Sequence, residues 1–246
     1  MSDHQKRSPR LFVEAGLSEG TEVACDRGQA HYLLNVMRLR GGDTVRAFNG
    51  RDGEWLCEIS SAAKKSCALT PASRTRTQTA LPDIHYLFAP LKHARLDYMV
   101  QKATELGCSR IQPVITAHTN ASRVKLERMR SNAIEAAEQC NLLDVPFIEE
   151  VTTLDNLLSS WPEERHLVFC DEEAQIASPL QALGGIGPGA LAVLIGPEGG
   201  FSDEERDRIR QLSCVTAISL GPRVMRADTA GVAAMALVQS ALGDWG

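Results

Sequence analysis

The chain has 246 residues, 43% of them hydrophobic, so it can form one large domain or two of ordinary size. No stretch approaches the apolar length of a membrane span, and the polar start MSDHQKRSPR lacks the apolar core of an export signal. We therefore expect a soluble cytoplasmic protein with no membrane partner.

The net charge of −5 argues by itself against binding to nucleic acid, but the charge is unevenly distributed. Residues 1–80 carry 12 Lys and Arg against 9 Asp and Glu, whereas the rest of the chain carries 14 against 22. This asymmetry indicates a basic module joined to an acidic one, although so small an excess also arises by chance.

The seven cysteines are scattered along the chain. None forms a C-x-x-C pair, and none lies near a histidine at the spacing of metal ligands. The pattern is typical of small buried hydrophobic residues in a reducing compartment, and it predicts no metal site.

The first part of the chain reads as short strands around one helix. The spacing of Tyr32, Leu33, Val36 and Met37 predicts a helix over 29–38. The expected strands, with Asn-Gly and Asp-Gly turn signals between the last two, cover residues 11–13, 21–24, 44–48 and 54–59. Together they predict a small barrel-like β domain over residues 1–72.

A polar stretch bounded by prolines, PASRTRTQTALP from Pro71 to Pro82, shows no periodicity. We expect a linker at residues 73–83, followed by a second domain over residues 84–246.

Strands and helices alternate in this second part, which predicts an α/β domain with a mainly parallel sheet covered on both faces. The expected strands are 84–89, 111–115, 147–151, 166–170, 191–195 and 215–220, and the expected helices are 96–106, 122–140, 154–160 and 229–242, with one more helix starting at Ser202.

Two glycine-rich loops follow the last two strands. Gly196, Gly199 and Gly200 follow the first, and Gly221 with Pro222 follows the second. Because parallel strands end at the same edge of a sheet, the loops predict a pocket in which backbone groups approach a ligand closely.

The helix after the first loop begins with a capping box, Ser202 with Glu205. Its acidic start, Asp203-Glu204-Glu205, repels phosphate, and no Gly-Lys-Ser/Thr motif follows the loop. The expected ligand is therefore neutral or cationic.

These loops carry a family resemblance. LIGPEGGFSDEE and SLGPRVMRADTA resemble the paired signature of the SPOUT methyltransferases, specifically the family that methylates uracil N3 in small-subunit ribosomal RNA. The segments PRLFV, HYLLNVMRLRGGD, FAPLK, QKATELG, EAAEQC and FCDEE extend the resemblance over nearly the whole chain. The resemblance implies a trefoil-knotted α/β domain that binds S-adenosylmethionine among three loops, an N-terminal domain similar to the PUA RNA-binding fold, a homodimer, and 16S rRNA of the small ribosomal subunit as partner.

The resemblance also implies roles for individual residues. Arg223 and Arg226 are the candidates for stabilising negative charge on the uracil, and Glu198 or Asp228 for accepting its proton, although a helix cap or salt bridge explains either carboxylate equally well. Cofactor contacts are expected from Leu194, Ile195, Gly196, Pro197, Gly199, Gly200, Leu220, Gly221, Pro222 and Met225. RNA contacts are expected from Arg10, Arg38, Arg40, Arg74 and Arg76, for which a solvated basic face is the alternative.

Two departures from the family pattern stand out. Asn141-Leu142 replaces a common Gly-Arg pair, and Arg226-Ala227-Asp228-Thr229 replaces Arg-x-Glu-Thr, where the shorter carboxylate still suits a helix N-cap. Two alternative functions stay open: a related enzyme that methylates a ribose 2′-hydroxyl or another RNA site, and a non-catalytic RNA-binding or ribosome assembly protein.

Overall fold

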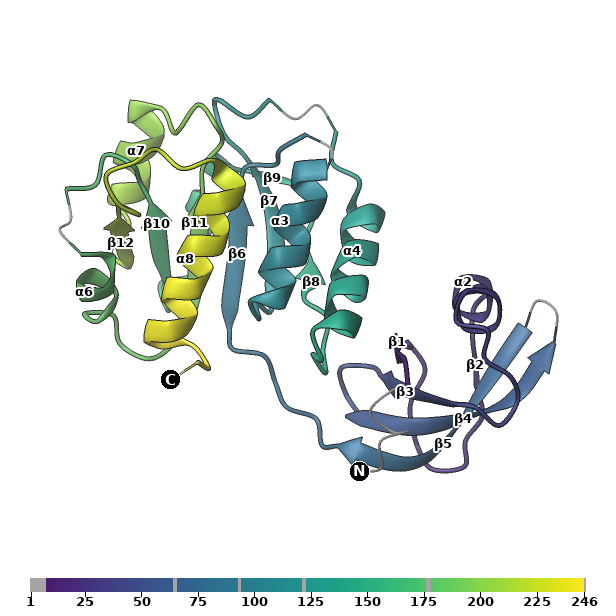
Figure 1. Ribbon diagram of the computed structural model, residues 1–246. Coiled ribbons are helices and arrows are strands. Elements are labelled where there is room, and N and C mark those ends of the chain that lie inside the picture. The colour runs from purple at the N-terminus through teal and green to yellow at the C-terminus, as the bar shows by residue number, and fades with distance from the viewer. Residues whose placement is uncertain (1–7, 64–65, 93, 121–122, 176–177, 246) are drawn as a thin grey trace. The chain divides into compact units, whose positions relative to one another are not determined.

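The computed structural model describes residues 8–63, 66–92, 94–120, 123–175 and 178–245 (Figure 1). The chain forms two compact units. The first contains the residues up to 80 together with 137–145, and the second contains 81–136 and 146–246.

The first unit is built on a five-stranded sheet in the order β1-β3-β4-β5-β2. Its strands are β1 (Arg10–Phe12), β2 (Val23–Ala24), β3 (Thr44–Phe48), β4 (Glu54–Ala63) and β5 (Ser66–Arg76). Strand β1 pairs with β3 in parallel, and the other pairs are antiparallel. Alternate apolar residues of these strands, such as Val45, Ile59 and Leu69, face a common core.

The helical segment of this unit begins earlier than expected and is not uniform. Helix α2 (Arg27–His31) starts with a capping box between Asp26 and Gln29, and it continues as a π-helical turn, η1 (Tyr32–Val36). Arg38 follows with a φ of 59°, which turns the chain away from the helix.

The predicted linker is wrong at its start, because residues 73–76 belong to β5. Proline is unusual within a strand, because it cannot donate a hydrogen bond to a neighbouring strand. In the structure Pro71 pairs with Cys57 next to an irregularity in the β4–β5 register, and its carbonyl accepts a hydrogen bond from Gly20 N at 2.9 Å. The irregularity accommodates the proline within a long strand.

The second unit is an α/β fold, as predicted. Its strands are all parallel, and they lie in the order β12-β10-β11-β6-β7-β8, with β9 paired to β7. The strands are β6 (Ile84–Phe88), β7 (Arg110–Ile115), β8 (Phe147–Ile148), β9 (Thr152–Thr153), β10 (Arg165–Cys170), β11 (Ala190–Ile195) and β12 (Val215–Ile218).

Helices cover both faces of this sheet. The helices are α3 (Ala94–Glu105), α4 (Leu126–Gln139), α5 (Leu154–Ser159), α6 (Pro179–Leu183), α7 (Asp203–Arg210) and α8 (Ala227–Leu242). Helix α8 packs against α3 and α6 (Figure 1), while α5 and α7 contribute Leu154 and Ile209 to a core cluster with Phe169 and Leu194. Strand β11 is therefore buried on both faces, as its continuous apolar sequence predicted.

Several predicted boundaries differ from the structure. The strand expected at 147–151 is only two residues long, the strand expected at 215–220 ends at Ile218, and the short elements β9 and α6 were not predicted. Ser122, the predicted start of α4, lies outside the described residues, but residues 123–125 are described and not helical, so α4 begins later than expected, at Leu126.

Candidate functional site

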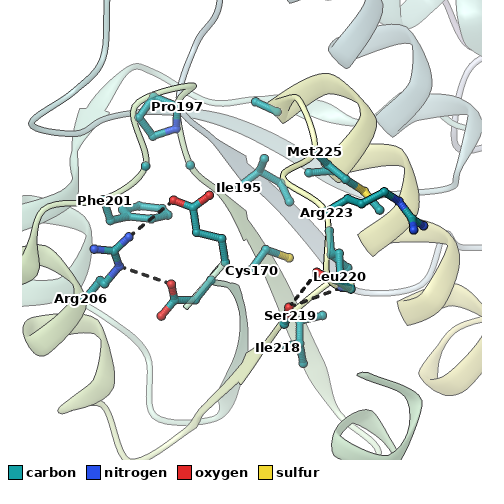
Figure 2. Close-up of a pocket in the computed structure, with 17 residues that line it drawn as sticks. Cys170, Ile195, Pro197, Phe201, Arg206, Ile218, Ser219, Leu220, Arg223 and Met225 are labelled. Atoms are coloured by element: carbon teal, nitrogen blue, oxygen red, sulfur yellow. Dashed lines mark hydrogen bonds and ion pairs between the residues drawn. The ribbon is translucent and has the colours of Figure 1, made fainter. Parts of the chain in front are cut away.

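A cavity opens at the carboxyl ends of β10, β11 and β12, where the sequence predicted a pocket. Its volume is about 620 Å³, including space open to solvent. Three segments line it: residues 170–172 at the end of β10, residues around the loop after β11, and residues between 218 and 230 around the loop after β12 (Figure 2).

Seven of the ten residues expected to contact a cofactor line this cavity. They are Ile195, Gly196, Pro197, Gly200, Leu220, Gly221 and Met225. The other three do not: Leu194 is fully buried in the core cluster beneath the sheet, Gly199 faces His118, and Pro222 is exposed. Strand alternation explains the case of Leu194, because neighbouring residues of a strand point to opposite faces.

Glycine is suited to the two loops for different physical reasons. A Cβ on Gly196 would lie 2.6 Å from the ring of Phe201, so this glycine makes room for the packing of that ring while its backbone lines the cavity. Gly221 has a φ of 113° and open space where its side chain would be, as expected beside a ligand.

Phe201 is a cavity residue that the sequence analysis missed. Its ring packs edge-to-face against Phe169 with 5.1 Å between centroids, and Figure 2 shows it beside the cavity below Pro197. An aromatic residue directly after a glycine loop, and before a capped helix, was the available signal.

The predicted capping box at the start of α7 is confirmed. Ser202 Oγ accepts from Glu205 N at 3.2 Å, and Glu205 Oε2 accepts from Ser202 N at 2.9 Å. Glu205 Oε1 also accepts from Ala117 N at 2.7 Å. The cap therefore satisfies one of the orphan N–H groups at the start of α7, that of Glu205.

The wall after β10 is acidic. Asp171 is almost fully buried and accepts from Arg206 Nε at 3.3 Å and Arg210 Nη2 at 2.6 Å. Arg206 also pairs with Glu173 at 3.1 Å, whereas Glu172, half exposed in the cavity, lies 3.8 Å from it. Of these groups Asp171, Glu172 and Arg206 line the cavity, so two carboxylates stand against one guanidinium and the wall favours a cationic ligand. The sequence analysis noted the FCDEE segment without assigning it site residues.

Of the four predicted catalytic residues, Arg223 is the one that lines the cavity. Arg226 is exposed at the N-cap of α8 without lining the cavity. Glu198 and Asp228 do not line the cavity either; both bind Arg95, a residue the sequence analysis did not single out. Arg95 makes two hydrogen bonds to Asp228, of 2.9 and 3.2 Å, which lower the pKa of this carboxyl below its ordinary value.

Asp228 is also not the helix N-cap that was expected. Helix α8 begins at Ala227 with Arg226 at the N-cap, and Asp228 is its second residue. Its Oδ1 accepts from Thr229 N at 2.9 Å, so the carboxylate still favours the positive end of the helix dipole.

Arg10 was expected to contact RNA, and the structure contradicts this prediction. Its guanidinium is buried: Nε donates to Glu54 Oε2 at 2.7 Å, and the other nitrogens donate to the carbonyls of Ala137, Glu138 and Leu142. Burial lowers its pKa from the ordinary value. All these partners belong to the first unit, where Arg10 satisfies carbonyls at the end of a helix.

The other four arginines expected to contact RNA are exposed. Arg38 and Arg40 follow the π-helical turn, and Arg74 and Arg76 lie on β5. Arg76 donates to Asn141 O at 2.7 Å within the same unit. In the described part of the chain no group of His, Cys, Asp or Glu could hold a metal ion, and no helix is long and apolar enough to cross a membrane.

Comparison with known proteins identifies both parts of the chain. Residues 77–239 match the model of an RNA methyltransferase domain, and residues 26–71 match that of an RNA methyltransferase PUA domain. The chain is 30% identical over 233 residues to ribosomal RNA small subunit methyltransferase E of Rickettsia conorii, with 94% of each chain covered. It is 29% identical to the protein of the same name in Bacillus subtilis, covering 93% of this chain and 95% of that one.

Two solved structures are similar over nearly their whole length. One is ribosomal RNA small subunit methyltransferase E of Neisseria gonorrhoeae bound to S-adenosylmethionine, with a TM-score of 0.87, 26% identity and coverage of 98% of this chain and 100% of that one. The other is a methyltransferase of Legionella pneumophila with its bound cofactor S-adenosylmethionine, with a TM-score of 0.86, 27% identity and coverage of 97% and 99%. The chain belongs to the ribosomal RNA small subunit methyltransferase E family.

Proposed function

We propose that this protein transfers the methyl group of S-adenosylmethionine to N3 of a uracil in 16S rRNA of the small ribosomal subunit. The observation that carries the proposal is the cavity at the ends of β10, β11 and β12, which has an acidic wall on one side and Arg223 on the other. It lies in a chain of a family whose members are named for methylating this RNA.

The residues of the cavity suit S-adenosylmethionine. Ile195, Pro197, Leu220 and Met225 offer apolar surface to an adenosine group, and Gly221 leaves its backbone accessible. The acidic wall suits the positive charges of the sulfonium and the amino group. Bound there, this cofactor would supply a methyl group already activated for displacement, so no metal is required.

The protein's own task is then to align the uracil, exclude water and manage charge. Loss of the N3 proton leaves negative charge that spreads to O2 and O4 of the base. We assign the stabilisation of this charge to Arg223 and Arg226, because guanidinium groups stay charged and bind oxygen anions directionally. Arg223 already lines the cavity, and Arg226 follows in the same loop.

We assign proton removal to Glu198 in preference to Asp228. Asp228 is held ionised by Arg95 with a lowered pKa, which makes it a weak base, and its side chain is only 19% exposed. Glu198 also accepts from Arg95, through Nη1 at 2.6 Å, but its side chain is 45% exposed, so a substrate base can reach it more easily.

We assign RNA binding outside the cavity to the first unit, through Arg38, Arg40, Arg74 and Arg76. Their exposure supports this assignment, and binding through such contacts weakens steeply as salt is raised. Arg10 is not included, because its guanidinium is buried among protein partners.

We also propose a homodimer. Helix α8 carries small residues. Ala233 and Leu237 are only partly buried and Ala241 is exposed, although Ala234 is buried within the unit. Light scattering after size exclusion tests the proposal. A mass near twice 26.8 kDa supports it, and the mass of one chain, 26.8 kDa, contradicts it.

The test of the function is methylation of purified small ribosomal subunits that lack the modification, followed by nucleoside mass spectrometry. Appearance of 3-methyluridine is the expected result. A 2′-O-methyl nucleoside would replace the proposed target by a ribose hydroxyl, and cofactor binding without any product would favour a non-catalytic role.

A further inference from the structure

Arg95 connects three distant parts of the second unit. It is the second residue of α3, and its guanidinium binds Glu198 after β11 and Asp228 at the start of α8. Nη1 donates to Glu198 Oε1 at 2.6 Å, while Nε and Nη2 donate to the two oxygens of Asp228 at 2.9 and 3.2 Å. The Asp228 contact is thus bidentate, the strongest geometry of an arginine with a carboxylate.

Glu198 belongs to the loop after β11, and Asp228 lies in the first turn of α8, directly after the loop that follows β12, yet neither carboxylate lines the cavity. Glu198 lies between Pro197 and Gly200, and Asp228 directly follows Ala227, all three of which are lining residues. Arg95, which is not among the lining residues, therefore connects the loop after β11 with the start of α8 from outside the cavity.

We infer that Arg95 is a positioning residue that holds the two loops at the spacing the methyl donor requires. The inference rests on the proposed function, because it takes S-adenosylmethionine as the ligand of the cavity. Without Arg95, Glu198 and Asp228 lose a shared counter-ion and like charges remain, so the loops separate. The cofactor must then supply the energy that brings the walls together, and its affinity falls.

A purely structural role is the alternative, and the chain offers a matched control. Arg128 of α4 binds Asp97 of α3 in the same bidentate way, with Nε 2.8 Å from Oδ1, but neither residue belongs to a cavity loop. An ion pair that only stabilises the fold predicts similar effects at the two sites. A positioning role predicts an effect on cofactor affinity at Arg95 alone.

The experiment is calorimetric titration of the full chain with S-adenosylmethionine, together with thermal unfolding. For Arg95→Ala we expect an affinity loss of about tenfold, and for Arg128→Ala less than twofold, with similar small changes in Tm. Arg95→Lys keeps the charge but loses the bidentate geometry, so its affinity should lie between those of wild type and Arg95→Ala. In turnover assays the KM for the cofactor should rise more than the KM for RNA.

The outcomes separate the two proposals. Wild-type protein that fails to bind S-adenosylmethionine overturns the proposed function. Wild-type protein that binds it, with Arg95→Ala binding within twofold of wild type, overturns the positioning role alone. If Arg95→Ala does not fold, Arg95→Lys decides, because unchanged affinity there would mean that the bidentate contact has no influence on the cavity.

Discussion

The two loops that form the cavity are built in opposite ways. The loop after β11 is fastened by protein contacts: Phe201 packs on Phe169, Ser202 caps α7, and His118 Nδ1 lies 3.0 Å from Gly199 O. The loop after β12 is largely open, with Arg223 exposed and Val224 84% exposed. The difference indicates that the first loop is a preformed wall, whereas the second presents side chains to a substrate.

The largest effect is expected from substitutions of residues that anchor the first loop to the core. Replacement of Phe201 by alanine removes a buried ring, which should lower the free energy of unfolding by about 3–5 kcal/mol. Chemical denaturation measures the loss. Phe201→Leu keeps an apolar side chain and should lose much less. Equal stability of Phe201→Ala and wild type would show that this ring does not fasten the loop.

Substitutions in the second loop should lower turnover without destabilising the fold. Arg226→Ala should lower kcat by roughly 10²–10³-fold, the loss typical of one donor to a developing anion, with most cofactor affinity retained. Single-turnover methylation and calorimetry together test this expectation. Arg208→Ala, at an exposed arginine of α7 outside the cavity lining, is the control. Unchanged turnover in Arg226→Ala would remove its assigned role.

A substitution at Gly196 tests the packing of the first loop with a smaller expected loss of stability. In Gly196→Ala the new methyl group meets the Phe201 ring at 2.6 Å, so either the ring or the strand end must move, at a cost of about 1–3 kcal/mol. A Cβ on Gly187 would meet only open space, so Gly187→Ala should change the stability little. Thermal unfolding of the pair is the measurement, and equal Tm values would contradict the close contact.

The smallest effect concerns the capping box. Ser202→Ala removes the acceptor for Glu205 N, which should cost about 1 kcal/mol of stability. The exposed Ser213 lies outside the helices, so Ser213→Ala serves as the control in the same denaturation series. A Ser202→Ala variant as stable as this control would mean that the cap is not needed to hold the loop.

Local sequence signals predicted the strand before the first loop and the helix cap after it. The apolar run of β11 and the Ser202 capping box depend on neighbouring residues, and both are confirmed. The wall formed by Phe201 required knowing that Phe169, thirty-two positions earlier, lies beside it. The trefoil knot was implied by family resemblance, since no local pattern specifies a threaded chain, and it stays a prediction.

The arginines also show that local sequence patterns do not reveal contacts between residues far apart in the chain. An arginine in a basic stretch looks like an RNA contact, but the buried position of Arg10 depends on carbonyls more than 120 positions away. Arg95 and its partners are likewise separated by 103 and 133 positions. Proline in a strand is a third example, because the irregularity that tolerates Pro71 lies in the pairing with β4.

The central claim is that the cavity between the two loops holds the methyl donor. Ala230 of α8 lines this cavity, so Ala230→Trp should fill it, whereas Ser240→Trp places the same ring at an exposed position of the same helix. Calorimetric titration with S-adenosylmethionine compares the two variants with wild type. We predict that binding is lost in Ala230→Trp and kept in Ser240→Trp at comparable Tm values. Undiminished binding in a folded Ala230→Trp variant would contradict the claim.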